Sequence, residues 1–337
     1  KTISYKPKSR QTGYIGKQYF PRTVPMSTPQ TFDLQKTVCV NPATGDIVGY
    51  SQMNTAEETR EAVRRARAAQ PAWAALPLEE RVRYVLRLRD YLVDHVDDVS
   101  DTISKDVGKT RVEALATEVL PSAMATDYYA KNARRFLQPR KVRAGSLLFL
   151  NKRSRIFRIP FGVIGIIAPW NYPLGIPMHE IVPALLAGNK VIFKTAPETQ
   201  MVGRKIEEMI QAAGLPADVF THLNIPGAII GQILLEPDHH VDKLFFTGSV
   251  PVGKTLMAKA AESLTPVSLE LGGNDPMLVC PDAHLARAVN GAMWAGLQNS
   301  GQSCGGVERV YVHQDVYEPF IQLLKQRVEA LRQGPNT

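Results

Sequence analysis

The chain has 337 residues, of which 44% are hydrophobic and 21% charged, so it is long enough for two or three domains with buried cores. No apolar stretch approaches the roughly 18 residues that a membrane-spanning helix needs, and three cysteines are too few for a disulfide framework in a chain of this length. We therefore expect a cytoplasmic protein in a reducing compartment.

The net charge of +8 arises from two segments of the sequence. Residues 1–37 carry a net charge of +6, residues 130–158 contain ten Lys or Arg and no acid, and the rest of the chain carries −8. Because the basic side chains are confined to these segments, the composition does not favour nucleic acid as a partner. The basic N-terminal arm, residues 1–36, is expected to be extended, and contact with an anionic membrane surface is a hypothesis for its role.

A strand pair and then several helices are predicted after this arm. The strands are expected at residues 37–40 and 47–51, joined by the turn Pro42-Ala43-Thr44-Gly45. Thr55 and Glu58 form a capping-box pattern at the start of a helix over residues 56–70. Further helices are predicted over residues 77–99 and 112–136.

From residue 155 onward, apolar strands alternate with single helices, which predicts a parallel α/β sheet. The expected strands are residues 155–159, 163–168, 190–194, 219–223, 243–247, 267–271, 277–279 and 309–312. The expected helices are residues 177–187, 202–213, 251–263, 283–298 and 317–332. Because ligands of such sheets bind at the carboxyl ends of the strands, the residues that follow each strand are the candidates for a site.

Two of these strand ends carry side chains that could bind a ligand. Strand 163–168 runs into Pro169-Trp170-Asn171-Tyr172-Pro173, which holds an aromatic ring and an amide in a rigid loop; a well-packed turn is an equally good interpretation of this loop alone. Strand 190–194 ends in Lys194, whose cation could hold a phosphate or a ribose hydroxyl. A solvated strand end is the commoner outcome for a single lysine.

The segment Gly248-Ser249-Val250-Pro251-Val252-Gly253-Lys254-Thr255 matches the pattern G-x-x-x-x-G-K-[ST], with a predicted strand before it and a helix after it. A P-loop phosphotransferase that uses this segment is therefore an alternative function. Pro251 argues against it, because proline lacks the backbone N–H that would contact phosphate. In either case the glycine turn leads into a helix N-terminus, which suits a pyrophosphate.

A carboxylate and a thiol follow later in the chain. Glu270 precedes Leu271-Gly272-Gly273, a turn that leaves the carboxylate able to reach a substrate; a surface acid beside a turn is the alternative. Cys304 lies among small residues in Gly301-Gln302-Ser303-Cys304-Gly305-Gly306, which favours an exposed nucleophile, although most free cysteines are buried and inert. Cys39 and Cys280 lie in apolar strands and are expected in the core.

Together these motifs resemble the aldehyde dehydrogenase superfamily, from about residue 37 to the end of the chain. The matching pieces are Pro169-Trp170-Asn171-Tyr172-Pro173, Lys194, Phe246-Thr247-Gly248-Ser249, Glu270-Leu271-Gly272-Gly273, Gly301-Gln302-Ser303-Cys304 and Arg309. Within the superfamily, residues 132–143 and 307–312 are most similar to the group that contains bacterial diapocarotenoid-aldehyde and long-chain aldehyde dehydrogenases. The resemblance implies a Rossmann-like dinucleotide-binding domain over residues 37–137 and 160–271, bridging or oligomerisation strands over residues 138–159, and an incomplete α/β catalytic domain over residues 272–337.

The resemblance also implies a function, the NAD(P)-dependent oxidation of a hydrophobic or long-chain aldehyde to the carboxylic acid. Cys304 would attack the aldehyde as a thiolate, and the Asn171 amide and the Cys304 backbone N–H would hold the oxyanion of the thiohemiacetal. Glu270 would activate the water that hydrolyses the resulting thioester. The residues implied in binding NAD or NADP are Trp170, Lys194, Gly248, Ser249, Gly253 and Leu271, and no metal is implied.

The sequence departs from the family pattern in three places, one of which is a short segment, Asn224-Ile225-Pro226-Gly227, before Gly231. Pro197 stands where the family usually has a glutamate that accepts the ribose hydroxyls, so the choice between NAD and NADP stays open. Family members continue well beyond residue 337, which makes the chain either a piece of a longer polypeptide or a truncated homologue. A non-catalytic subunit with a structural or binding role is therefore a second alternative function. The family also implies a homo-oligomer, either a dimer or a tetramer.

Overall fold

The computed structural model of the chain describes residues 36–334, except residues 144 and 150. The basic arm expected over residues 1–36 thus lies outside the described residues, apart from Lys36. The first described elements are β1 (Lys36–Val40) and β2 (Ile47–Gln52), an antiparallel pair that confirms the predicted one. Within the described part of the chain, no helix is both long enough and apolar enough to span a membrane.

Five parallel strands form the central sheet in the order β7-β6-β5-β8-β9. They are β5 (Val163–Ile167), β6 (Lys190–Lys194), β7 (Phe220–Leu223), β8 (Lys243–Gly248) and β9 (Val267–Leu271). The chain runs outward from β5 through β6 and β7, and then returns to the other side of β5 for β8 and β9. This Rossmann-like order confirms the predicted α/β fold class. The reversal between β5 and β8 marks the place where such sheets bind ligands.

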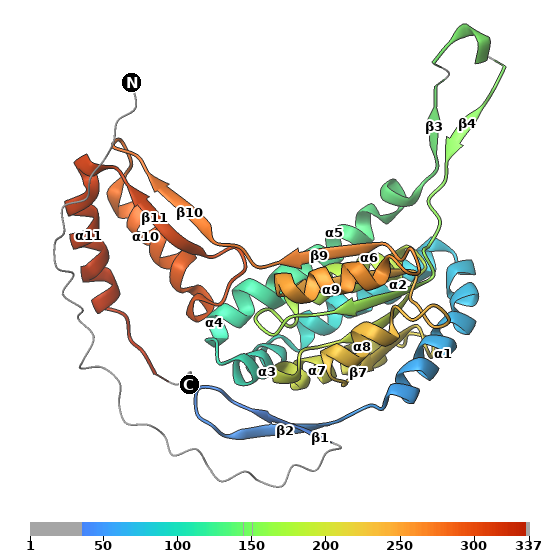
Figure 1. The fold of residues 1–337 in the computed structure, drawn as a ribbon, viewed down its shortest axis with the longest axis horizontal. Helices are drawn as coiled ribbons and strands as arrows, with labels where there is room; N and C mark the ends of the chain where they lie inside the picture. Colours follow the sequence, from blue (N-terminus) through green and yellow to red (C-terminus); the bar gives the residue numbers. More distant parts are fainter. Residues whose placement is uncertain (1–35, 144, 150, 335–337) are drawn as a thin grey trace. The chain divides into compact units, whose positions relative to one another are not determined.

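Helices cover both faces of the sheet (Figure 1). One face packs against α2 (Leu78–Asp94), α3 (Val96–Val107), α5 (Leu120–Leu137), α6 (Gly175–Leu186) and α7 (Gln200–Ala212). The other packs against α1 (Ala56–Ala75), α8 (Gly227–Ile233) and α9 (Val250–Ala260). Of these, α8 has no counterpart among the predicted helices.

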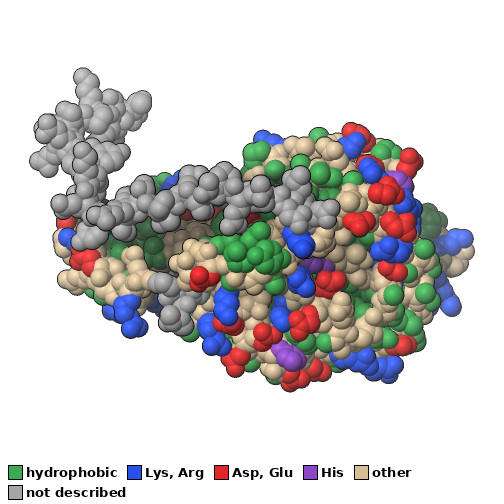
Figure 2. Space-filling model, turned by 90° about the horizontal axis from the view of Figure 1, so that it is seen from below, with side chains coloured by type: hydrophobic (Ala, Val, Ile, Leu, Met, Phe, Trp, Pro, Cys, Tyr) green, Lys and Arg blue, Asp and Glu red, His purple; other side chains and the backbone are tan. Residues whose placement is uncertain are grey.

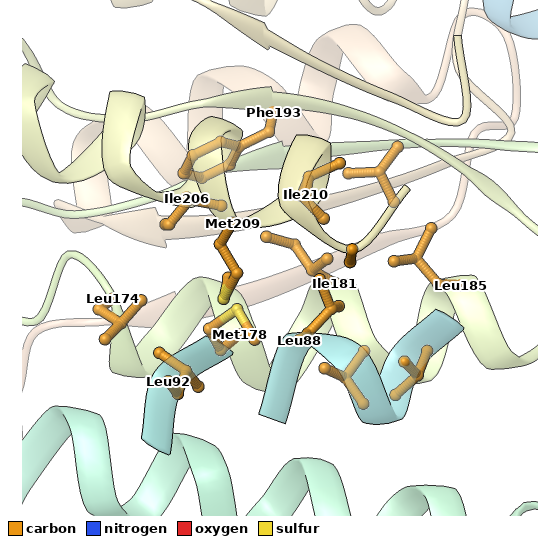
Figure 3. Close-up of a cluster of buried hydrophobic side chains, with 14 of the residues drawn as sticks. Leu88, Leu92, Leu174, Met178, Ile181, Leu185, Phe193, Ile206, Met209 and Ile210 are labelled. Carbon is orange, nitrogen blue, oxygen red and sulfur yellow. The ribbon is translucent and has the colours of Figure 1, made fainter. Parts of the chain in front are cut away.

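Alternation along β5 explains why its sequence is apolar at consecutive positions. Ile164 and Ile166 contribute to the hydrophobic cluster on one face of the sheet, whereas Val163 and Ile167 contribute to the cluster on the other. A strand that is buried on both faces shows a continuous apolar run rather than an alternating pattern. In the first cluster, side chains from α2, α6, β6 and α7 point toward one another (Figure 3). They include Leu88, Leu92, Met178, Ile181, Leu185, Phe193, Ile206, Met209 and Ile210.

Local hydrogen bonds set the helix boundaries. The Thr55 hydroxyl accepts the Glu58 N–H at 3.1 Å, and the Glu58 carboxylate accepts the Thr55 N–H at 2.7 Å, so the predicted capping box is confirmed. The single helix predicted over residues 77–99 is wrong, because the chain divides at His95 into α2 and α3. His95 has φ −113° and ψ 26°, outside the helical region.

The helical pattern predicted over residues 112–136 is interrupted. A short α4 (Arg111–Ala114) leads into a π-helical turn, Leu115–Val119, before α5 begins. A π turn inserts one residue into the helix, and such turns frequently occur at functional sites. This one carries Glu118, whose side chain is fully buried.

Two smaller β units lie outside the central sheet. The antiparallel strands β3 (Arg140–Val142) and β4 (Ser154–Ile156) form a hairpin where the bridging segment is predicted (Figure 1). The parallel strands β10 (Asp275–Val279) and β11 (Val307–Val312) follow β9 in the chain. Two helices, α10 (Leu285–Leu297) and α11 (Gln314–Glu329), share a small core with this pair.

The two cysteines expected in the core have different environments. Cys39 in β1 is 1% exposed, and burial raises the pKa of its thiol to about 11. The expectation for Cys280 is wrong, because its thiol is exposed. Since β10 buries Val279, strand alternation turns the neighbours Leu278 and Cys280 away from the small core.

Acidic and basic side chains are interspersed over the face shown in Figure 2. Several ion pairs of the described residues are exposed, such as those of Arg64 with Glu57 at 2.7 Å and with Glu61 at 2.8 Å. Exposed pairs of this kind contribute little to the free energy of unfolding. The stability of the fold therefore rests mainly on the apolar clusters that cover the two faces of the sheet.

We expect Leu88→Ala to lower the free energy of unfolding by about 2–5 kcal/mol, because Leu88 is fully buried and its truncation leaves a cavity. The control is Val112→Ala, at a position that is 75% exposed, where the change should stay within about 0.5 kcal/mol. Urea denaturation followed by circular dichroism measures both variants. Equal effects of the two substitutions would contradict the assignment of Leu88 to the core.

Candidate active site

A cavity of about 1040 Å³ lies at the carboxyl ends of β5, β8 and β9, where the strand order reverses. Seven of the nine candidate residues line it, namely Trp170, Asn171, Gly248, Ser249, Glu270, Leu271 and Cys304. The structure thus brings together residues that are up to 134 positions apart in the chain, from Trp170 to Cys304. Lys194 and Gly253 are not among the lining residues.

Asn171 lies between β5 and α6, in a loop that Pro169 and Pro173 stiffen by restricting φ. Its Nδ2 donates to the carbonyl oxygen of Gln302 at 3.0 Å, and its Oδ1 accepts the Tyr172 N–H at 3.1 Å. The bond from Tyr172 orients the amide so that its nitrogen faces the Gln302 backbone. The candidate oxyanion donor therefore lies against the segment that carries the candidate nucleophile.

Cys304 follows a sharp turn at the end of α10. Asn299, Ser300 and Gly301 have φ values of 53°, 57° and 76°, all in the left-handed region. Glycine adopts this conformation freely, asparagine more readily than most residues, and serine at some cost. The turn leaves Cys304 exposed at the cavity wall, as expected for a nucleophile rather than for a core cysteine.

A further contact joins the segments that follow Glu270 and Cys304. Arg309 in β11 donates to the carbonyl oxygen of Asn274 at 2.6 Å, and the carbonyl oxygen of Cys304 would lie 3.6 Å from a Cβ placed on Gly273. The turn after Glu270 is therefore adjacent to the Cys304 segment.

Two carboxylates line the cavity. Glu270 is exposed at the end of β9, opposite Thr247 of β8. Glu180 of α6 is half-buried, and burial, together with the negative charge of Glu270, raises the pKa of its carboxyl to about 8. Sequence reasoning missed Glu180. The signal that could have found it is the polar pair His179-Glu180 within a helix that is otherwise apolar.

Lys194 ends β6 and is only 5% exposed. Burial lowers the pKa of its ammonium group to about 8, and the nearby Glu198 carboxylate opposes this shift. The interpretation of Lys194 as a solvated strand end is therefore wrong.

The junction of β8 and α9 is the candidate site for a phosphate group. Ser249 is the N-cap of α9, and its side chain makes no capping hydrogen bond. The buried Thr247 hydroxyl has no hydrogen-bond partner among the described residues, and Thr247 lines the cavity together with Gly248 and Ser249. A helix N-terminus without a side-chain cap beside the unpartnered Thr247 hydroxyl suits a pyrophosphate.

Gly253 acts through packing rather than at the cavity surface. A Cβ at this position would come within 2.8 Å of Leu271 Cδ2, so glycine lets α9 approach β9 closely and places Leu271 at the cavity wall. Since α9 begins at Val250, Gly253-Lys254-Thr255 lie inside the helix. The segment Gly248–Thr255 therefore does not form the open loop that the phosphotransferase alternative requires.

A fully buried ion pair supports the Asn171 loop from behind. Lys109 Nζ lies 2.7 Å from Glu118 Oε1, and neither side chain is exposed. The other Glu118 oxygen accepts the N–H groups of Leu174 at 2.8 Å and Gly175 at 3.0 Å. Lys109 also donates to the Asn171 carbonyl at 2.8 Å. Sequence reasoning missed this pair for two reasons. Residues nine positions apart are not neighbours on a helix face, and the direction of the Glu118 side chain is set by the π turn.

The structure describes no set of three or more His, Cys, Asp or Glu side chains arranged to hold a metal ion in residues 36–334.

Comparison with known proteins gives one consistent result. A family model described as the aldehyde dehydrogenase family matches residues 30–337. The chain is 35% identical over 295 residues to 4,4'-diapolycopene aldehyde oxidase of Methylomonas sp, an alignment that covers 88% of this chain and 55% of that protein. It is 34% identical over 303 residues to succinate semialdehyde dehydrogenase of Acinetobacter baylyi, covering 89% of this chain and 61% of the relative.

Solved structures agree with these relatives. An E. coli NADP dependent enzyme superposes with a TM-score of 0.84 at 34% identity, covering 89% of this chain and 61% of the other. A lactaldehyde dehydrogenase from Escherichia coli has a TM-score of 0.83 at 32% identity, covering 89% and 61%. The chain thus spans between 55% and 61% of the length of these similar proteins.

We expect the raised pKa of Glu180 to make the fold less stable as the pH increases. The folded chain keeps Glu180 protonated up to a pH of about 8, whereas an ordinary glutamate in the unfolded chain ionises near 4.5. Relative to Glu180→Gln, the wild type should therefore lose free energy of unfolding between about pH 4.5 and pH 8, and the difference between the two should be independent of pH below this range. Urea denaturation at a series of pH values measures the difference, and a constant difference across the range would contradict it.

Proposed function

This chain belongs to the aldehyde dehydrogenase family, and we propose that it oxidises an aldehyde to the carboxylic acid with NAD or NADP as the hydride acceptor. The observation that carries this proposal is the meeting of Cys304, Asn171 and Glu270 at one cavity. A thiol, an amide donor and a carboxylate at the carboxyl end of a Rossmann-like sheet can together perform nucleophilic attack, oxyanion stabilisation and hydrolysis.

In the first step, the Cys304 thiolate attacks the carbonyl carbon of the aldehyde. A C–S bond forms and the carbonyl electron pair moves onto oxygen, which gives the oxyanion of a thiohemiacetal. The Asn171 amide and the Cys304 backbone N–H donate to this oxygen, where negative charge develops. NAD or NADP, when bound, would supply the acceptor for the hydride of this carbon. Loss of the hydride and return of the oxygen electron pair to the carbonyl leave a thioester on Cys304.

In the second step, Glu270 removes a proton from a water molecule, and the water oxygen attacks the thioester carbon. The C–S bond breaks, the Cys304 thiolate leaves, and the carboxylic acid is released. The exposure of Glu270 at the cavity supports this role, because the water must reach it from solvent.

The cofactor site is proposed at the β6, β8 and β9 ends of the sheet. Gly248 and Ser249 would hold the pyrophosphate at the α9 N-terminus, and Lys194 would meet the adenosine ribose. Trp170 and Leu271 would line the site, and Gly253 would support it by packing against Leu271. Both NAD and NADP belong to the proposal, since Pro197 replaces the usual ribose-binding acid and one similar solved structure is described as NADP dependent.

The proposed substrate is a hydrophobic or long-chain aldehyde. Tyr172, Ile176 and Phe245 give the cavity an apolar wall, and one relative is described as a diapolycopene aldehyde oxidase. The relatives described as semialdehyde dehydrogenases favour a second class, short aldehydes with a carboxylate at the far end.

The domain assignment also stays a proposal, with residues 37–137 and 160–271 as the dinucleotide-binding domain and residues 272–337 as part of the catalytic domain. The β3–β4 hairpin, residues 138–159, would bridge the subunits of a homodimer or tetramer, because it lies outside the central sheet with its strands exposed. The basic arm, residues 1–36, would contact an anionic membrane surface.

We expect Cys304→Ala to abolish NAD(P)H formation while sparing cofactor binding, because it removes only the nucleophile. The matched control is Cys280→Ala, which removes another exposed thiol and should leave turnover unchanged. The assay follows the absorbance of the reduced nicotinamide with aldehydes of increasing chain length and with NAD or NADP. Undiminished turnover in Cys304→Ala would contradict the proposed mechanism. Cofactor binding without turnover in the wild type would favour the alternative of a non-catalytic subunit.

A further inference from the structure

The carbonyl oxygen of Asn171 connects its own loop to two other segments of the chain by hydrogen bonds. It accepts hydrogen bonds from Lys109 Nζ at 2.8 Å and from Asn299 Nδ2 at 2.9 Å. Lys109 anchors the Asn171 loop to the buried Glu118. Asn299 comes from the other side, from the sharp turn that precedes Cys304.

Asn299 closes a ring of hydrogen bonds across the two loops. Its Nδ2 donates to the carbonyl oxygens of both Asn171 and Gln302, at 2.9 and 3.1 Å. The Gln302 carbonyl also accepts Nδ2 of Asn171 at 3.0 Å. The ring therefore holds the Asn171 backbone, the Asn171 amide and the residue two positions before Cys304 in one arrangement.

The position of Asn299 is itself anchored. Its backbone N–H donates to Glu113 Oε1 at 2.8 Å, and the second Glu113 oxygen caps α4 by accepting the Thr110 N–H at 3.1 Å. The residue is 2% exposed, although its φ of 53° is a conformation that glycine would adopt at lower cost. A turn alone would not require a buried amide here, so the side chain has a use beyond the turn.

We propose that Asn299 is a positioning residue that fixes the Asn171 amide relative to Cys304. One N–H of Asn171 is bound to Gln302, so the plane of the amide is set and its second N–H has a defined direction. This proposal rests on the proposed function, in which that amide holds the oxyanion formed at Cys304. Another contact, from Gln298 Nε2 to the Tyr172 hydroxyl at 3.2 Å, joins the same loops but reaches neither the Asn171 amide nor its carbonyl.

Hydrogen exchange tests the hydrogen-bonded bridge that Asn299 forms between the Asn171 loop and the turn before Cys304, and it does not require turnover. Asn299→Gly keeps a residue that accepts the left-handed conformation and removes the side-chain amide together with its CH2 group. Ser300→Gly is the matched control, because Ser300 has a φ of 57°, is exposed, and lies next in the same turn. In Asn299→Gly, exchange should accelerate in both residues 171–175 and residues 299–304, measured by mass spectrometry. Ser300→Gly should leave residues 171–175 as in the wild type. Acceleration confined to the turn would overturn the bridge.

A double-mutant cycle tests whether Asn299 acts through Asn171. We expect Asn171→Ala to lower kcat by about a hundredfold or more, as for loss of an oxyanion donor. Asn299→Gly should lower kcat by about tenfold to a hundredfold with the KM for the cofactor unchanged. The double variant should be no slower than Asn171→Ala alone. Additive losses, or an equal loss in Ser300→Gly, would overturn the proposal.

The two experiments separate the proposals. A wild-type chain without dehydrogenase activity contradicts the proposed function, and the exchange result then decides on the bridge alone.

Discussion

The buried ion pair between Lys109 and Glu118 is the interaction on which the geometry of the cavity depends. Both charges are fully removed from water, so each must be satisfied by close partners. Lys109 also donates to the Asn171 carbonyl and lies over the Tyr172 ring, 4.3 Å from its centroid, and Glu118 also accepts the N–H groups of Leu174 and Gly175. Removing one member of such a pair typically costs about 3–5 kcal/mol, because the other charge stays buried without compensation. The cavity wall is thereby coupled to the stability of the fold.

The two walls of the cavity differ in how firmly they are held. The wall formed by the Asn171 loop has the ion pair behind it, whereas the wall formed by the Cys304 segment depends on fewer contacts. The Asn171 loop is held by the two prolines that flank it and by the ion pair behind it. The Cys304 segment follows three consecutive left-handed residues, and it is linked to the Asn171 loop by hydrogen bonds of Gln298, Asn299 and Gln302. Residues held in left-handed backbone conformations cluster at functional sites, and this turn directly precedes the candidate nucleophile Cys304. The amide of Asn171 lies where the two sides meet.

Sequence reasoning succeeded where a feature is encoded locally. The β6 and β9 ranges agree with the structure residue for residue. The buried strand β6 has the apolar run Val191-Ile192-Phe193, whereas the edge strand β9 alternates apolar and polar side chains. The Thr55 capping box is likewise encoded within four residues. Sequence reasoning failed where a helix boundary or the burial of a side chain depends on contacts with distant parts of the chain. The break at His95 leaves no Gly or Pro signal in the sequence, and the exposure of Cys280 follows from which face of β10 meets α10 and α11.

The sequence by itself determined the α/β architecture, the family, and the identity of Asn171, Glu270 and Cys304 as candidates, because each follows from a short motif or from the periodicity of apolar residues. Only the tertiary structure decided that these three side chains share one cavity, and that Glu180 joins them. It also assigned partners to Lys109, Glu118 and Asn299. The physical reason is that a buried charge or amide is defined by the groups that satisfy it, and those groups come from segments far apart in the chain.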